Sequence, residues 1–340
     1  MKEAKYTDDE SRVMRWAILC SGLLTLAGAT TTVATFVSVR RLRQFGRPLV
    51  VLVWLAVCDV LRGVTAVGAA LVPPRSGPLC SVQGFFIQFS NLAAMGWTLA
   101  VSHNLYAVLA HVDLDYSRYF VLYHLIIWPF ALIMSLAPVA HYGPAGVWCW
   151  IEASAPGFRL AFYLCLMLSF PLLVLVLVRG TLVVTGNRRR ATDAAPSLFA
   201  MRLRKLYLRI SVLIALFFVC WTAAMVNRLL ELTGHTSFAA ALAQAITDPL
   251  QGFFDACVFF AIPIVRNEMV CCGKATAPPL TEHKALLVGD NQTARSRSVL
   301  ARRLLFGSSP SPNLQTLGPP SAGPTPIRTL NGANVVVTVP

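Results

Sequence analysis

The chain has 340 residues, of which 56% are hydrophobic and only 13% are charged. Soluble domains carry about 25% charged residues, so this composition excludes a water-soluble globule, and its apolar content excludes a chain that is disordered throughout. The formal net charge is +14, but the basic residues fall between apolar segments rather than on one polar face, which argues against nucleic acid as a partner.

Seven apolar stretches follow one another along the chain, each long enough to cross a hydrocarbon core of about 30 Å as a helix. No series of alternating strands separated by turns is apparent, so a membrane β-barrel is not expected. The sequence therefore predicts an all-α membrane protein, a seven-transmembrane helix bundle over 16–265. The expected spans are 16–39, 48–72, 80–110, 120–140, 158–184, 206–231 and 239–265.

The distribution of Lys and Arg predicts the orientation of the bundle, because positively charged loops stay on the cytoplasmic side. Most of these residues fall inside if the N-terminus lies outside and the C-terminus inside. Residues 1–15 are then a short extracellular N-terminus. Acidic residues precede the first span, and its apolar run is long for a signal peptide, so we expect an uncleaved signal-anchor.

The composition changes after the last span. The juxtamembrane segment 266–272 ends in Cys271 and Cys272, a pair placed for palmitoylation, with an unmodified reduced pair as the alternative. Residues 273–340 are rich in Pro, Ser, Thr and scattered Arg. This composition predicts a disordered cytoplasmic tail that is open to phosphorylation, with kinases and arrestin-like proteins as partners.

Two of the nine cysteines, Cys80 and Cys149, are expected on the outside, and no other cysteine is expected there. Because the outside is oxidising, they predict a disulfide that ties the loop after the fourth span to the start of the third. Cysteines within the spans are expected only to pack.

Motifs of enzymes and metal sites are missing from the sequence. The six histidines are dispersed, and no H-E-x-x-H, G-x-S-x-G or P-loop sequence occurs. We therefore expect no catalytic residue, no metal and no cofactor. The spans also lack a buried lysine, which a retinal Schiff base requires, so an opsin is not expected.

Polar residues in the third span recur at helical spacing, on one face of the helix. A polar group that faces lipid is costly, so this face is expected to point into the bundle, with the third span at its centre. We expect the inner positions of this face to form interhelical hydrogen bonds and its outer positions to line a ligand pocket. The residues of this face are Gln88, Asn91, Met95, Thr98, Ser102 and Tyr106.

The second and seventh spans carry charged residues. Asp59 and Arg62 share one face of the second span, and Asp248 and Asp255 share one face of the seventh. At a rise of about 1.5 Å per residue, Asp59 and Asp255 lie at similar depth, and Arg62 lies between the depths of Asp255 and Asp248. If the two spans are neighbours, Arg62 can neutralise one or more of these carboxylates. Two interpretations stay open, a structural salt bridge and a switch that rearranges on activation.

A ligand site is expected among the outer halves of spans two, three, five, six and seven. Its arginines favour a small anionic ligand, because guanidinium groups bind carboxylate and phosphate in pairs of hydrogen bonds. Arg228 is the most informative, since Glu231 is its only acidic neighbour on the sixth span. Alternatively, the charge of Arg62 is neutralised by ion pairs with Asp59, Asp248 or Asp255, and Arg159 faces lipid headgroups. The expected lining is Arg62, Gln88, Asn91, Trp150, Arg159, Asn227, Arg228 and Asp248.

Several short motifs give the chain a resemblance to a known family. They are Gly146-Val147-Trp148-Cys149-Trp150-Ile151 with Gly157-Phe158-Arg159, Val219-Cys220-Trp221 with Val226-Asn227-Arg228, and Gln251-Gly252-Phe253-Phe254. Over about 14–272 the chain resembles the cyclic-AMP-receptor-like family of G-protein-coupled receptors, the slime-mould chemoattractant receptor type. The resemblance implies a heterotrimeric G protein as partner and leaves the extracellular ligand unknown.

The chain departs from rhodopsin-like receptors, since Ser102-His103-Asn104-Leu105-Tyr106 ends the third span without D-R-Y and Asp248-Pro249-Leu250 stands in place of N-P-x-x-Y. Secretin-like and frizzled receptors are more distant, because the N-terminus is short. We expect a multi-pass receptor of the plasma membrane. The alternative is a seven-helix transporter or channel, which would need a continuous polar path.

Basic residues around the third inner loop are expected to contact the G protein, although membrane topology and anionic membrane lipids explain part of this charge. These residues are Arg188, Arg189, Arg190, Arg202, Arg204 and Lys205.

Overall fold

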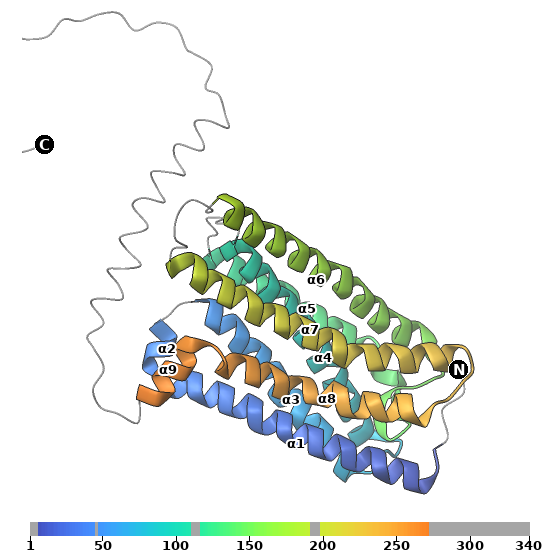
Figure 1. The fold of residues 1–340 in the computed structure, drawn as a ribbon. Helices are drawn as coiled ribbons and strands as arrows, with labels where there is room; N and C mark the ends of the chain where they lie inside the picture. The colour runs from blue at the N-terminus through green and yellow to red at the C-terminus, as the bar shows by residue number, and fades with distance from the viewer. Residues whose placement is uncertain (1–5, 45–46, 110–115, 191–197, 272–340) are drawn as a thin grey trace, which may run out of the picture. The chain divides into compact units, whose positions relative to one another are not determined.

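A computed structural model describes residues 6–44, 47–109, 116–190 and 198–271 (Figure 1). Within these ranges the chain forms a bundle of seven long helices and two short ones. They are α1 (Asp8–Ser38), α2 (Arg40–Gln44), α3 (Arg47–Leu71), α4 (Pro78–Leu109), α5 (Tyr116–Leu136), α6 (Pro156–Arg190), α7 (Leu198–Leu232), α8 (Phe238–Phe260) and α9 (Pro263–Cys271).

The segment between α5 and α6 holds a β-hairpin, which corrects the expectation of a purely helical chain. A short 3-10 helix (Val139–His141) leads into β1 (Tyr142–Ala145), which pairs antiparallel with β2 (Trp148–Ile151). The two-residue turn begins at Gly146, whose φ of +75° suits glycine. We call this end of the bundle the hairpin end; α2 and α9 lie at the opposite end (Figure 1).

Six of the long helices in the described residues, α1 and α3 to α7, are long and apolar enough to cross a membrane. The remaining long helix, α8, is not among them. Its 23 residues cover about 34 Å, which is sufficient length, but four charged or amide-bearing residues interrupt its apolar sequence. They are Gln244, Asp248, Gln251 and Asp255.

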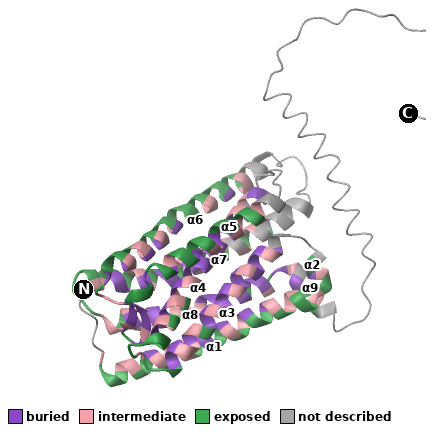
Figure 2. Ribbon diagram, turned by 180° about the vertical axis from the view of Figure 1, so that it is seen from behind, coloured by how far each residue is buried: buried purple, intermediate pink, exposed green. Residues whose placement is uncertain are grey.

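Exposed residues run along the outer faces of the bundle (Figure 2), and many of them are large and apolar. Leu125 and Leu168 on the outer faces of α5 and α6 are 65% and 64% exposed, whereas Asp59 and Gln251 in the interior are fully buried. Large apolar side chains on the surface are favourable only against lipid or another apolar partner. The described part of the chain therefore has the surface of a membrane protein.

The helix boundaries differ from the expected spans by several residues in most of the helices, and for the first and the last helix the cause is local. The first helix begins at Asp8 rather than at residue 16, because Thr7 and Glu10 form a capping box at its N-terminus. The last span, expected over 239–265, is two helices. Pro263 lacks the N–H that would continue α8 and instead occupies the first position of α9, where that donor is not needed.

Helix α4 is central, as its polar face predicts. It contacts α3, α5, α6, α7 and both strands of the hairpin. Thr98 and Ser102 are fully buried on it and donate to the carbonyls of Ala94 (2.9 Å) and Thr98 (2.8 Å) in the preceding turn. This half of the polar face is therefore satisfied within its own helix. The predicted disulfide between Cys80 and Cys149 is confirmed and joins α4 to β2.

Helices α1, α3 and α8 approach closely at small residues. A Cβ added to Gly252 would lie 2.6 Å from Cγ2 of Thr25 and 2.7 Å from Cβ of Asp59. Only glycine allows α8 to lie this close to its two neighbours. The close approach places the charged residues of α3 and α8 within hydrogen-bonding range of each other.

Candidate functional site

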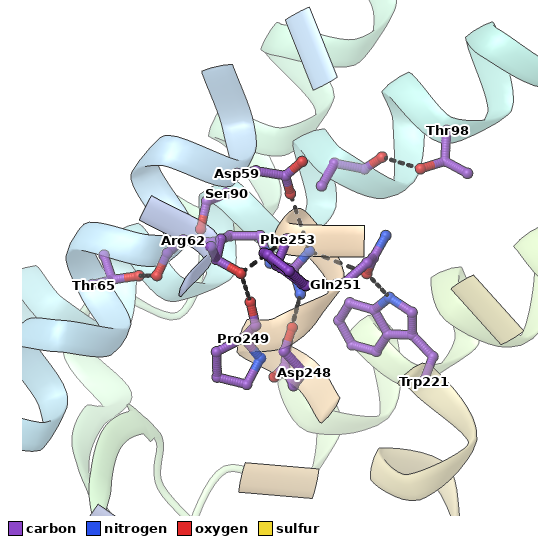
Figure 3. A network of polar contacts seen from close by, with 12 residues as sticks. Asp59, Arg62, Thr65, Ser90, Thr98, Trp221, Asp248, Pro249, Gln251 and Phe253 are labelled. Carbon is purple, nitrogen blue, oxygen red and sulfur yellow. Dashed lines mark hydrogen bonds and ion pairs between the residues drawn. The ribbon is translucent and has the colours of Figure 1, made fainter. Parts of the chain in front are cut away.

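Arg62 joins α3 to α8 through its guanidinium group (Figure 3). Nη2 donates to Oδ1 of Asp248 (2.7 Å) and to the backbone carbonyl of the same residue. Nη1 donates to Oε1 of Gln251 (3.1 Å) and lies 3.4 Å from Oδ1 of Asp59. Arg62 is only 3% exposed. The expected pairing of Arg62 with acids of the second and seventh spans is therefore present.

Trp221 extends this network to α7. Its Nε1 donates to Oε1 of Gln251 (2.8 Å), so that oxygen accepts hydrogen bonds from two different helices. The guanidinium carbon of Arg62 lies 5.7 Å from the centroid of the Trp221 ring, a cation–π distance. Helices α3, α7 and α8 therefore meet at one charged centre.

The network holds more acidic than basic groups. Asp255 is buried, and within the described residues no hydrogen bond of normal geometry reaches either of its carboxyl oxygens or Oδ2 of Asp59, although these two carboxyl groups interact through their charges. An isolated buried charge is several kcal/mol unfavourable. Arg62 is thus the cation that balances Asp59 and Asp248, and its loss would leave them in a buried acidic cluster.

A second cluster surrounds Arg228 on α7. Its Nε donates to the hydroxyl of Tyr163 on α6 (2.7 Å), and Nη1 forms an ion pair with Glu231. Its guanidinium carbon lies 5.3 Å from the centroid of Trp150 on β2. Asn227, also on α7, donates to Oε1 of Gln244 on α8 (2.8 Å). The two clusters together tie α3, α6, α7, α8 and the hairpin to each other.

The hairpin is fixed over the end of the bundle by several bonds. Trp150 Nε1 donates to Oε1 of Gln88 on α4 (2.8 Å), and Arg159 Nε donates to the carbonyl of Ile151 (2.7 Å). Tyr142 donates its hydroxyl to the carbonyl of Ser135 (2.8 Å), and burial raises its pKa. Arg159 is buried against β2 rather than facing lipid headgroups, which corrects that alternative.

Beneath the hairpin lies a cavity of about 690 Å³, its open mouth included. It is lined from α1, α3, α4, β2, α6, α7 and α8. Five of the eight predicted ligand-site residues line this first cavity. They are Arg62, Asn91, Trp150, Arg228 and Asp248.

A second cavity of about 400 Å³ adjoins the first at Trp148 and Arg228, which line both. Arg159 and Asn227 line this second cavity, together with Tyr6, Trp148 and Glu231. Gln88 lines neither of the two and instead holds the ring of Trp150 in place.

Sequence reasoning missed several residues of the site. Gln251 and Gln244 continue the acidic face of α8 at steps of three and four residues from Asp248, and this spacing was a usable signal. Trp148 and Trp221 stand in the motifs that carry the family resemblance, but no role in the site was predicted for them. Tyr163 had no comparable signal, because an aromatic residue in an apolar span usually only packs.

Most of the expected G-protein contacts and lipidation sites lie outside the described part of the chain. This holds for the side chains of Arg188, Arg189, Arg190, Arg202, Arg204 and Cys271, and for Cys272 and the whole tail. Lys205 is exposed on α7. Within the described residues, no group of three or more His, Cys, Asp or Glu side chains is arranged to hold a metal ion.

The family model for the slime mold cyclic AMP receptor matches residues 5–269. Cyclic AMP receptor-like protein A of Dictyostelium discoideum is 23% identical, covering 54% of this chain and 48% of its own. Cyclic AMP receptor 1 of the same organism is 27% identical, covering 48% and 41%. An ascaroside receptor of Arthrobotrys oligospora is 26% identical, covering 40% and 36%. The matches thus span about half, or less, of these relatives.

Squid rhodopsin has a similar fold. Its crystal structure superimposes with a TM-score of 0.64 at 16% sequence identity, covering 83% of this chain and 91% of that one. The bundle therefore has the architecture of a seven-helix receptor. Since the family model covers nearly all of the described residues, the chain belongs to the slime mold cyclic AMP receptor family and is a multi-pass protein of the plasma membrane.

Proposed function

We propose that this chain is a G-protein-coupled receptor that transmits an extracellular signal, carried by a small anionic ligand, to a heterotrimeric G protein. The observation that carries the proposal is the first cavity, in which Arg62 and Arg228 stand among Trp148, Trp150 and Trp221 beneath the disulfide-linked hairpin. Arginines provide paired donors for carboxylate or phosphate, and the indole rings provide apolar faces for the rest of the ligand.

The hairpin end faces the outside in this proposal. A disulfide persists only in an oxidising compartment, and Cys80–Cys149 lies at this end. Helix α1 starts at the same end, so the N-terminus is outside. With α8 as the seventh span, the chain enters α9 and the tail on the inside. The basic loops at the opposite end support the same orientation.

The Arg62 network offers a route from the cavity to the helices. Arg62 and Asp248 line the cavity, while their partners Gln251 and Trp221 link α8 to α7. A ligand that binds one arrangement of these helices more tightly shifts the bundle toward it. The basic residues at the opposite end would then contact the G protein.

The juxtamembrane segment and the tail serve regulation in this proposal. Cys271 and Cys272 are expected to incorporate labelled palmitate, which would hold α9 at the membrane. Kinases and arrestin-like proteins would act on the tail.

The names of the relatives do not fix the ligand, because cyclic AMP receptors and an ascaroside receptor are both among them. A ligand screen with G-protein activation as readout identifies an agonist. Arg228→Ala then lowers agonist potency at least tenfold, equal to about 1.4 kcal/mol, in dose–response curves normalised to surface protein. Arg75→Ala, an exposed arginine that lines neither cavity, is the matched control.

Because Arg228→Ala leaves Glu231 without its cation, the double variant Arg228→Ala/Glu231→Ala is measured beside it and should lose potency too. An unchanged midpoint in both variants would show that Arg228 is structural. The second candidate, a transporter or channel, predicts solute flux across vesicles without stimulated nucleotide exchange.

A further inference from the structure

Both arginines of the first cavity already hold acidic partners. Arg62 binds Asp248 and Asp59, and Arg228 binds Glu231. An anionic ligand that enters the cavity therefore meets guanidinium groups whose charge is neutralised. The arginines that the sequence predicts to bind an anionic ligand become available only if one internal carboxylate moves away.

Replacement of the carboxylates on Arg62 by a ligand anion would disrupt a large network. Its guanidinium serves two carboxylates, the amide oxygen of Gln251 and a backbone carbonyl on α8. A ligand that took this guanidinium would leave several buried acceptors without a donor. Arg62 therefore keeps its internal partners.

Replacement of the carboxylate on Arg228 by a ligand anion requires only Glu231 to move. Glu231 is one turn further along α7, which ends at Leu232, so its side chain stands at the end of the helix. Glu231 also lines the second cavity, where Asn227 Nδ2 lies 3.3 Å from its Oε1. After leaving Arg228, the carboxylate would still have a donor and open space.

The guanidinium of Arg228 would stay in place during such an exchange. Its Nε is held by the hydroxyl of Tyr163, and the ring of Trp150 lies 5.3 Å from its central carbon. Neither partner brings a competing negative charge. Arg228 is therefore a preorganised anion site whose occupant can change.

We propose that Glu231 occupies the anion site of Arg228 in the resting receptor, and that a carboxylate or phosphate of the ligand replaces it there. This inference rests on the proposed function and refines it, because it makes Glu231 the residue that sets selectivity for anions. A ligand without an anionic group cannot displace Glu231, since it offers Arg228 no charge in return. The remainder of the ligand lies among the indole rings of the first cavity.

Tyr6, which precedes α1, is placed to receive the displaced carboxylate. It lines the second cavity with Glu231. Burial raises the pKa of Tyr6, and the nearby Glu231 carboxylate adds to this rise. The hydroxyl therefore keeps its proton at neutral pH and can donate it in a hydrogen bond.

The test uses the purified full chain in nanodiscs and inorganic phosphate as the probe. Phosphate replaces chloride at constant ionic strength, so that screening does not change, and the dissociation constant is obtained from the shift in thermal unfolding. Glu231→Gln is expected to bind phosphate at least tenfold more tightly than the wild type. Glu231→Ala repeats the measurement with a second side chain in case Glu231→Gln folds poorly.

Two controls locate the effect. Arg228→Gln/Glu231→Gln should lose the gain, and Glu152→Gln, which removes a hairpin carboxylate outside both cavities, should behave as the wild type. Equal phosphate affinity in Glu231→Gln, Glu231→Ala and the wild type would overturn the proposal, as would a gain that persists without Arg228.

Nucleotide exchange by a G protein, measured on the same preparations, separates this inference from the proposed function. Nucleotide exchange without a gain in phosphate affinity in Glu231→Gln overturns only the role of Glu231. The phosphate gain without exchange supports the anion site and counts against the receptor function.

Discussion

Arg62→Met tests how much the buried charge network contributes to the stability of the bundle. Methionine keeps most of the apolar stem and removes the guanidinium. The substitution leaves Asp59 and Asp248 without their cation in a region where Arg62 is 3% exposed. It also removes the donor to Gln251.

The expected loss is large because one partner of a buried ion pair is removed while the other stays. Such changes cost about 3–5 kcal/mol. Trp221→Phe is the comparison, since it removes one hydrogen bond to the same Gln251 oxygen, which is expected to cost about 1 kcal/mol, and keeps an aromatic ring at the position that faces Arg62. The difference of at least about 2 kcal/mol corresponds to roughly a thirtyfold difference in the folding equilibrium.

Thermal unfolding of the detergent-purified variants and their abundance at the cell surface are the two measurements. Arg62→Met should be several-fold less abundant than Trp221→Phe, since losses of 1–2 kcal/mol already change abundance by that factor. Arg62→Met/Asp248→Asn should recover part of the loss, because it removes one of the stranded carboxylates. If Arg62→Met were as stable as Trp221→Phe, the network would not hold the bundle together.

Three further changes have defined outcomes. Cys80→Ser or Cys149→Ser should lower surface expression, because the disulfide closes a loop with a sequence separation of 69 residues and contributes up to about 4 kcal/mol in the chain-entropy model; wild-type expression of both would contradict this. Gly252→Ala should lower the stability of the bundle by about 1–3 kcal/mol through overpacking. Gly68→Ala, with open space around its Cβ position, should leave the stability unchanged. Equal stability of the two variants would refute the close packing at Gly252. Truncation after Lys274 should preserve ligand binding and change desensitisation, and lost binding in a well-expressed truncation would refute the regulatory role of the tail.

The faces of the helices could be predicted from the sequence, because helical periodicity alone decides which residues point inward together. The polar face of α4 and the pairing of Arg62 with Asp59 and Asp248 follow from this rule and from a rise of 1.5 Å per residue. The disulfide could be predicted because the outside is oxidising and only two cysteines were expected there, so no geometric argument was needed.

Partners on other helices could not be predicted in the same way. Tyr163 lies 65 residues from Arg228, and their hydrogen bond depends on how α6 and α7 are rotated against each other, which periodicity does not fix. The hairpin was missed because four-residue strands are too short to show an alternating pattern. The burial of Arg159 follows from the hairpin, so its position was missed as well.

The most direct test of the central claim is nucleotide exchange by a purified heterotrimeric G protein, with the full chain in nanodiscs and a library of small organic anions. We expect at least one compound to accelerate exchange above the rate with empty nanodiscs, and Arg228→Ala to shift its midpoint at least tenfold. Exchange that stays at the empty-nanodisc rate with every compound, together with solute flux through proteoliposomes of the same protein, would contradict the assignment as a receptor.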